Sequence, residues 1–226
     1  MIANLALVSP AGAELHDRGG GLIYDDVLDV TWLQDAAWHV TSNAPNVDAN
    51  GRMLWQDAMN WVESLVYHDS VRNVDWDDWR LPRILPVNGT AYDISYSCEG
   101  LTDNGYNITS PASELSYMYH VNLGGVSLVS LVDGKCTASP GAGIDNPSPF
   151  TGISSGVWSR NEIPDDPARI FFVGMGNGHQ NWFEKTVAKS PWAVRDGDVA
   201  LAPDGEITLG DIEVLERKVQ GLVSFP

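Results

Sequence analysis

The chain has 226 residues, of which 43% are hydrophobic, so it is long and apolar enough for one generous domain, or for a domain with a small appendage. Its 30 acidic and 13 basic residues give a formal net charge of −17, which repels phosphate backbones and all but excludes nucleic acid as a partner. No apolar run reaches the roughly 18 residues of a membrane-spanning helix.

Residues 1–13 resemble the end of a signal peptide. Ala11-Gly12-Ala13 follows a short apolar run and matches the A-x-A pattern of a cleavage site, although the charged start of a signal peptide is missing. We interpret Met1 as an internal or mis-assigned start and expect the mature chain to begin near Glu14. This interpretation predicts an extracellular or periplasmic, secreted protein, and the alternative is an ordinary N-terminal strand.

The first predicted elements are a hairpin and a helix. Residues 22–28 read as two short strands around the acidic turn Asp25-Asp26. Apolar residues at helical spacing predict a helix from Arg52 to Tyr67. In the segment 75–82 tryptophans alternate with acids, which we interpret as a turn whose indoles pack inward; a cation or sugar site is the alternative.

Two loops, 86–110 and 132–152, are expected to flank a second helix. Ser110 is the predicted N-cap of this helix, and Gly124 marks its end. Each loop contains one of the two cysteines, Cys98 and Cys136, and we expect a disulfide between them in an oxidising compartment. Two free thiols are the alternative.

Four closely spaced strands are predicted to complete the domain as an antiparallel meander. They cover 157–159, 170–175, 182–183 and 192–195. The glycine-rich segment 174–178 is predicted to be a hairpin turn, because no helix follows it to bind a phosphate. The order of hairpin, helix, helix and sheet predicts the α+β class.

Several short motifs, taken in order, resemble a group of exported bacterial proteins. The motifs are Gly19–Asp25, Thr31–Ala36, Trp79–Pro82, Val157–Arg160, Phe172–Trp182 and Trp192–Arg195. The group carries the C-terminal domain of the Legionella collagen-like adhesin (the Lcl C-terminal domain), and the match spans about residues 19 to 197. The W-R-L-P element is shared with formylglycine-generating enzymes, whose fold is C-type-lectin-like.

The resemblance implies a C-type-lectin-like domain over residues 14–197, with secretion or surface display. One member of the group adheres to sulfated polysaccharide, and the resemblance raises that ligand as a candidate here. A chain with a net charge of −17 is expected to lack the basic patch that a polyanion needs, so we do not transfer that ligand.

The tail, residues 198–226, resembles half of a dockerin, a module in which an acidic loop binds calcium and leads into a helix. The resemblance implies calcium ligands at Asp204 and Asp211, with Thr208 nearby and with Asp198 in a loop two residues longer. The alternative is a packing helix, capped by Thr208, that binds no ion.

Catalytic motifs are weak in this sequence. Ser154 lies in a G-x-S-x-G pattern, but a nucleophile elbow needs a strand before the serine and a helix after it, and neither is predicted. The oxidase chemistry of formylglycine-generating enzymes needs a late cysteine pair, whereas Cys98 and Cys136 lie mid-chain. The histidines lack the spacing of a metal hydrolase. We therefore expect no catalysis.

We expect a secreted or cell-surface binding module. Ligand contacts are predicted at Asn177, His179, Asn181 and Trp182, together with the two long loops, because binding residues concentrate on loops held by a rigid scaffold. The expected partner is a polysaccharide, the cell envelope or another secreted protein. A structural component of an extracellular matrix or filament is the alternative, and an enzyme is the third class.

Overall fold

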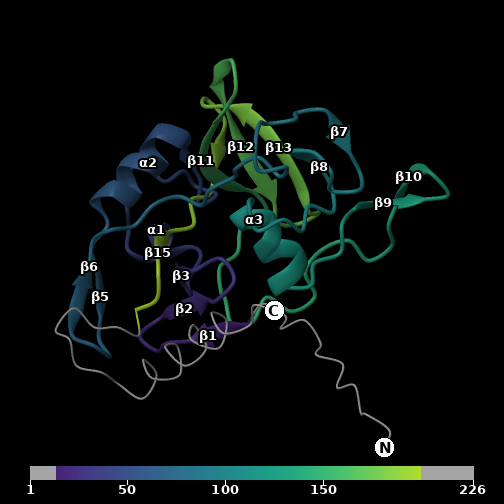
Figure 1. Ribbon diagram of the computed structural model, residues 1–226. Coiled ribbons are helices and arrows are strands. Elements are labelled where there is room, and N and C mark those ends of the chain that lie inside the picture. The colour runs from purple at the N-terminus through teal and green to yellow at the C-terminus, as the bar shows by residue number, and fades with distance from the viewer. Residues whose placement is uncertain (1–13, 200–226) are drawn as a thin grey trace, which may run out of the picture.

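Residues 14–199 are described in a computed structural model of the protein. The predicted signal-peptide remnant, 1–13, and all but the first two residues of the dockerin-like tail lie outside the described residues. Strands are arranged in two larger sheets and three two-stranded pairs, and the helices are short (Figure 1). This combination is compatible with the predicted α+β class.

The first sheet joins the beginning of the domain to its end. Its strands, in the order β1-β2-β3-β15, are Leu15–Asp17, Leu22–Asp25, Val30–Leu33 and Val194–Asp196. All neighbours are antiparallel, and the register places Leu15, Asp25, Val30 and Asp196 in one row across the sheet.

The predicted N-terminal hairpin is confirmed, but its turn is longer than predicted. The buried carboxylate of Asp25 accepts the backbone N–H groups of Val27 and Leu28, at 3.1 and 3.0 Å. Asp29 then adopts a φ of 51°, which turns the chain into β3. The second strand therefore begins at Val30 rather than at Val27.

The second sheet has five strands in the order β11-β12-β13-β8-β7. These are Val157–Ile163, Asp166–Gly174, His179–Glu184, Asn104–Gly105 and Tyr96–Ser97. The first three form the predicted meander, and residues 174–178 form its predicted hairpin turn. The fourth predicted strand does not join this sheet: β15 pairs with β3, because Trp192 packs on Trp32 and donates from Nε1 to the carbonyl of Leu33 at 2.9 Å.

The remaining elements are short. The helices are α1 (Trp38–Thr41), α2 (Trp55–Ser64) and α3 (Glu114–Tyr117), which continues as the π-helical turn η1 (Met118–Asn122). The small strand pairs are β4 (Met53–Leu54) with β14 (Ala188–Lys189), β5 (Tyr67–Asp69) with β6 (Val74–Trp76), and β9 (Val129–Val132) with β10 (Lys135–Ala138).

Both predicted helices are present but shorter than predicted. The N-cap of α3 is Ser113, whose hydroxyl accepts the N–H of Ser116 at 3.3 Å, and not Ser110. Among residues 14–199, no helix combines the length and the apolar character of a membrane span.

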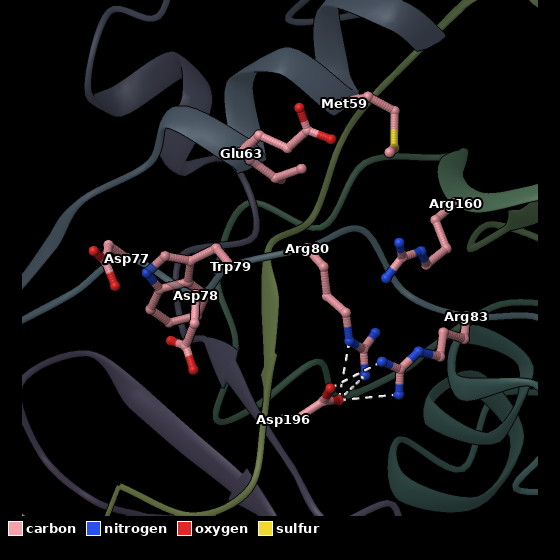
Figure 2. A pocket seen from close by; sticks show the side chains of 10 residues that line it. Met59, Glu63, Asp77, Asp78, Trp79, Arg80, Arg83, Arg160 and Asp196 are labelled. Atoms are coloured by element: carbon pink, nitrogen blue, oxygen red, sulfur yellow. Dashed lines mark hydrogen bonds and ion pairs between the residues drawn. The ribbon is translucent and has the colours of Figure 1, made fainter.

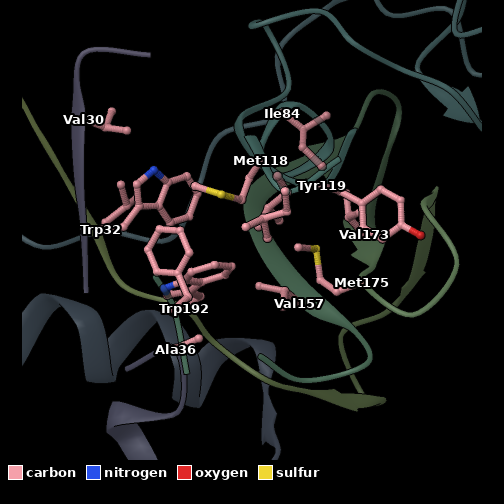
Figure 3. Close-up of a cluster of buried hydrophobic side chains, with 14 of the residues drawn as sticks. Val30, Trp32, Ala36, Ile84, Met118, Tyr119, Val157, Val173, Met175 and Trp192 are labelled. Atoms are coloured by element: carbon pink, nitrogen blue, oxygen red, sulfur yellow. The ribbon is translucent and has the colours of Figure 1, made fainter. Parts of the chain in front are cut away.

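The five-stranded sheet separates two apolar cores. On one face, Phe171 and Val173 pack with Trp32, Trp192 and the residues around Met118 (Figure 3). The other face is covered by α2 and by the segment of β6 that leads to Trp79. Trp76 and Trp79 are 8% and 4% exposed, which confirms that the indoles of this segment pack inward. Large aromatic side chains thus fix the strands that position the sites below.

Candidate functional site

The W-R-L-P motif connects the two sheets. Arg80 exchanges both backbone hydrogen bonds with Val194 of β15, at 2.8 and 3.0 Å. Two residues later the carbonyl of Pro82 accepts the N–H of Arg160 on β11, at 2.9 Å. Three of the motifs that carried the family resemblance therefore meet in one place, through backbone contacts.

The Arg80 side chain holds this junction together with a buried ion-pair network. Its guanidinium forms a bidentate pair with Glu114, at 2.8 and 2.7 Å, and a second pair with Asp196, at 3.0 and 2.6 Å. Burial alone would lower the pKa of Arg80, but the two carboxylates outweigh it and raise that pKa above its ordinary value. A further bond to the carbonyl of Leu81 occupies the guanidinium, so Arg80 has a structural role.

A pocket of about 380 Å³ opens beside this network, between α2, the segment 77–83 and β11 (Figure 2). Arg83 lines it and is paired with Asp196, at 2.8 Å. Arg160 also lines it and forms no ion pair with any residue in the range 14–199. The sequence predicted no cluster of basic side chains, whereas the structure brings three arginines to one pocket, among carboxylates rather than as a continuous basic patch.

The structure separates the four predicted ligand residues. Asn177 lies in the β12–β13 turn, where its Oδ1 accepts the N–H of His179 at 3.1 Å. Successive residues of a strand point to opposite faces. His179 and Asn181 therefore share one face of the sheet with Phe172, whereas Trp182 points to the other face and packs edge-on against Phe171. Trp182 is partly buried and packs against the first apolar core, apart from His179 and Asn181.

Two tyrosines accompany His179 and Asn181. Tyr106 stacks on the His179 ring, with centroids 4.5 Å apart and an interplanar angle of 10°, and Tyr96 lies edge-on to both rings. Tyr96 is 53% exposed, and Phe183 continues the same surface at 36%. We call Tyr96, Tyr106, His179, Asn181 and Phe183 the β13 face. The sequence analysis predicted that the loop 86–110 contributes to binding, but it did not name Tyr96 or Tyr106. Tyrosines in a loop rich in Gly and Asn were the sequence signal that could have identified them.

The predicted disulfide is present and supports the β13 face. Cys98 and Cys136 are bonded with a Cα–Cα distance of 5.9 Å, which fastens β10 to the loop between β7 and β8. Asn107 adds to this attachment by donating from Nδ2 to the carbonyls of Cys98 and Val129, at 2.8 and 2.9 Å. Figure 1 shows the β9–β10 hairpin projecting beyond β7 and β8.

One cluster of potential metal ligands, and no nucleophile elbow, is found among residues 14–199. Glu14, His16 and Asp26 place one ligand atom each within 4.8 Å of one another, a donor set that a divalent cation accepts, but proximity of exposed acids alone assigns no site. Ser154 lies in an irregular segment before β11 with no helix after it, so it does not form a nucleophile elbow.

Of the predicted calcium ligands, only Asp198 lies among the described residues. Its carboxylate accepts Nε and Nη2 of Arg18, at 3.0 and 2.7 Å, and its side chain is 4% exposed. Asp204, Thr208 and Asp211 lie outside the described residues. The calcium site therefore stays a prediction, while Asp198 has a partner within the domain.

Burial lowers the pKa of His39, His120 and His179, and each has one ring nitrogen buried without a hydrogen-bond partner among the described residues. His39 is 1% exposed, with Nε2 bonded to the carbonyl of Gly51 at 2.9 Å. These rings are neutral at pH 7.

The buried histidines predict acid sensitivity. Below the ordinary histidine pKa of 6.5, His39 is protonated in the unfolded chain but stays neutral in the folded chain, where its pKa is lower. The unfolding free energy therefore falls as the pH falls from 6.5 towards the folded pKa. The slope is up to about 1.4 kcal/mol per pH unit for one histidine. Urea unfolding at pH 7 and at pH 5.5, for the wild type and His39→Gln, measures it. An unchanged pH dependence in the variant would show that His39 is not responsible.

No protein-family model matches the chain, and no curated protein or solved structure matches it. The resemblances to the Lcl C-terminal domain, to a dockerin and to the C-type-lectin-like fold therefore stay predictions. The β13 face and the arginine-lined pocket are the two arrangements on which the following proposals rest.

Proposed function

We propose that the protein is a secreted or cell-surface binding module, without catalysis, that recognises a neutral glycan at the β13 face. The observation that carries this proposal is the stack of Tyr106 on His179 beside the half-exposed Tyr96. Aromatic rings offer flat apolar surface to a sugar ring, and a neighbouring amide such as that of Asn181 supplies hydrogen bonds to its hydroxyls. Such mixed aromatic and amide surfaces fix orientation as well as affinity.

The charge of the β13 face supports a neutral ligand. None of its five residues is an acid or a base that is charged at pH 7, since burial lowers the pKa of His179 and favours the neutral ring. The chain as a whole carries −17, so an anionic polysaccharide would be repelled on approach. A neutral glycan, rich in hydroxyl groups, is not repelled by the negative chain and needs no charged partner on the β13 face.

The attachment of the β13 face supports a binding role as well. β8 pairs with β13 through Gln180 and Gly105, and the Cys98–Cys136 disulfide holds the loop that carries Tyr96. Gly105 has a φ of 135°, and a Cβ there would lie 1.7 Å from the carbonyl oxygen of Ser97, so only glycine allows β7 and β8 to approach this closely. A surface ordered before binding loses less entropy when the ligand arrives.

Substitutions on the β13 face are expected to weaken glycan binding. Tyr96→Ala and Asn181→Ala should each reduce affinity about tenfold, because each removes one stacking surface or one set of hydrogen bonds, worth about 1.4 kcal/mol. Pull-down on insoluble cellulose and chitin, followed by titration with soluble oligosaccharides of the one that binds, measures the change. The matched control is Asn60→Ala, an exposed asparagine on α2.

Thermal unfolding of each variant separates a lost contact from a lost fold. Retained affinity in both Tyr96→Ala and Asn181→Ala would remove the β13 face from the proposal. Failure of the wild type to bind any neutral glycan in a wider immobilised panel would overturn the ligand class.

A further inference from the structure

The arginine-lined pocket carries opposite charges on its two sides. Arg83 and Arg160 lie on the side of β11, and Figure 2 shows both guanidinium groups directed towards the same space. Glu63, from α2, and Asp77 line the other parts of the pocket. Neither of these two acids forms an ion pair within residues 14–199, whereas the neighbouring Asp78 is taken by Arg195 at 2.7 Å.

Hydrogen-bond donors remain free at the basic side. Arg80 is occupied by Glu114, Asp196 and the carbonyl of Leu81. Arg83 donates one N–H of each terminal nitrogen to Asp196, and its other side-chain N–H groups form no hydrogen bond to a described residue. Arg160 is exposed, and its side chain makes no hydrogen bond to any described residue.

At the basic side, residues 14–199 supply fewer paired carboxylates than guanidinium groups. The three guanidinium groups of Arg80, Arg83 and Arg160 face two carboxylates, those of Glu114 and Asp196. One positive charge is therefore left over, in a chain whose overall charge is −17. Guanidinium groups with free parallel N–H donors match the two oxygens of a carboxylate.

We propose that this pocket binds a small zwitterion, an amino acid or a dipeptide. Arg83 and Arg160 receive its carboxylate, and Glu63 receives its ammonium group, whereas Asp77 lies on the far side of Trp79 (Figure 2). Met59 and Val62 of α2 form an apolar wall for its side chain. The pocket, at about 380 Å³, falls in the size range of small-molecule sites.

A zwitterion fits this pocket better than a simple anion. A ligand with a net negative charge is repelled by the whole chain at −17 and by Glu63 nearby. A zwitterion has no net charge to be repelled, and it satisfies both sides of the pocket at once. The site is independent of the β13 face, since none of its lining residues belongs to that face.

The test is a calorimetric or NMR titration of the full chain at low ionic strength. The probes are leucine and glycylleucine as zwitterions, succinate as an anion, and leucine amide as a cation. In the wild type we expect leucine and glycylleucine to bind more tightly than either succinate or leucine amide. Arg160→Gln should weaken the zwitterions about tenfold, because charge-assisted hydrogen bonds are lost.

Glu63→Gln gives a second readout that a general structural effect would not produce. It should weaken the zwitterions while strengthening succinate, because it removes a negative charge that attracts the ammonium group and repels the anion. The matched control is Arg169→Gln, an arginine on β12 whose side chain is 44% exposed and pairs with Asp166. This control should leave all four affinities unchanged.

Three results would overturn the proposal. The first is succinate binding more tightly than either zwitterion in the wild type. The second is unchanged zwitterion affinity in an Arg160→Gln protein that unfolds at the wild-type temperature. The third is the absence of zwitterion binding at about 10 mM, beyond the millimolar range of weak sites. None of them bears on glycan binding, which is read from Tyr96 and Asn181.

Discussion

Arg80→Ala is expected to lower the unfolding free energy by about 3 to 5 kcal/mol, the usual cost of removing one partner from a buried ion pair. The substitution leaves the carboxylate of Glu114, whose side chain is 8% exposed, without its bidentate partner. It also removes one of the two arginines that hold Asp196. Urea unfolding followed by tryptophan fluorescence measures the loss, since Trp79 precedes the substituted residue.

Two companion variants locate the cause. Arg160→Ala, an exposed arginine of the same pocket, should change stability by about 0.5 kcal/mol or less. Arg80→Met combined with Glu114→Leu should recover part of the loss, because it removes the unpaired charge along with its partner. A cost below about 1 kcal/mol for Arg80→Ala would mean that the Arg80 network does not hold the sheets together.

The second large effect is expected for the disulfide. Replacing both Cys98 and Cys136 with serine frees a loop with a sequence separation of 38, for which the chain-entropy estimate is about 4 kcal/mol and the usual measured range is 2 to 4. The loss should appear in urea unfolding of the oxidised wild type and the double variant. Amide hydrogen exchange should rise in 96–107, where the loop carries Tyr96 and Tyr106.

Mild reduction of the wild type serves as the control, because it should give the same loss without any substitution. Equal stability of the oxidised and reduced proteins would show that backbone contacts such as those of Asn107 suffice to hold the loop. If reduction of the disulfide abolishes glycan binding while the secondary structure is unchanged, then binding at the β13 face depends on the attachment of its loop.

Local patterns were sufficient for some parts of the fold. The meander of β11, β12 and β13 was predictable because apolar strands alternate with the glycine-rich turn 174–178 over a short stretch. The pairing of β15 with β3 was not, since its partner lies about 160 residues earlier and no local signal distinguishes the two sheets. The start of α3 was placed at the wrong serine because Ser110 and Ser113 are both suitable caps.

The arrangement of the candidate sites could be predicted from the sequence to a smaller degree. His179 and Asn181 were named from their turn and strand, but Trp182 was grouped with them although alternation along a strand sends it to the opposite face. The arginine-lined pocket was missed because Arg83, Arg160 and Glu63 come from three distant segments. A net charge describes the whole chain and cannot show that basic residues gather locally.

The row formed by Leu15, Asp25, Val30 and Asp196 has a mechanical consequence. Leu15 and Asp196, on the two outer strands, therefore lie at the same end of the first sheet, three strand spacings or about 15 Å apart. Tension applied between these two points pulls across the strands, so it opens their hydrogen bonds one after another instead of shearing them together. A sheet whose hydrogen bonds open one after another resists such tension less than a sheet whose strands are sheared together, so this first sheet is poorly suited to transmit load between Leu15 and Asp196.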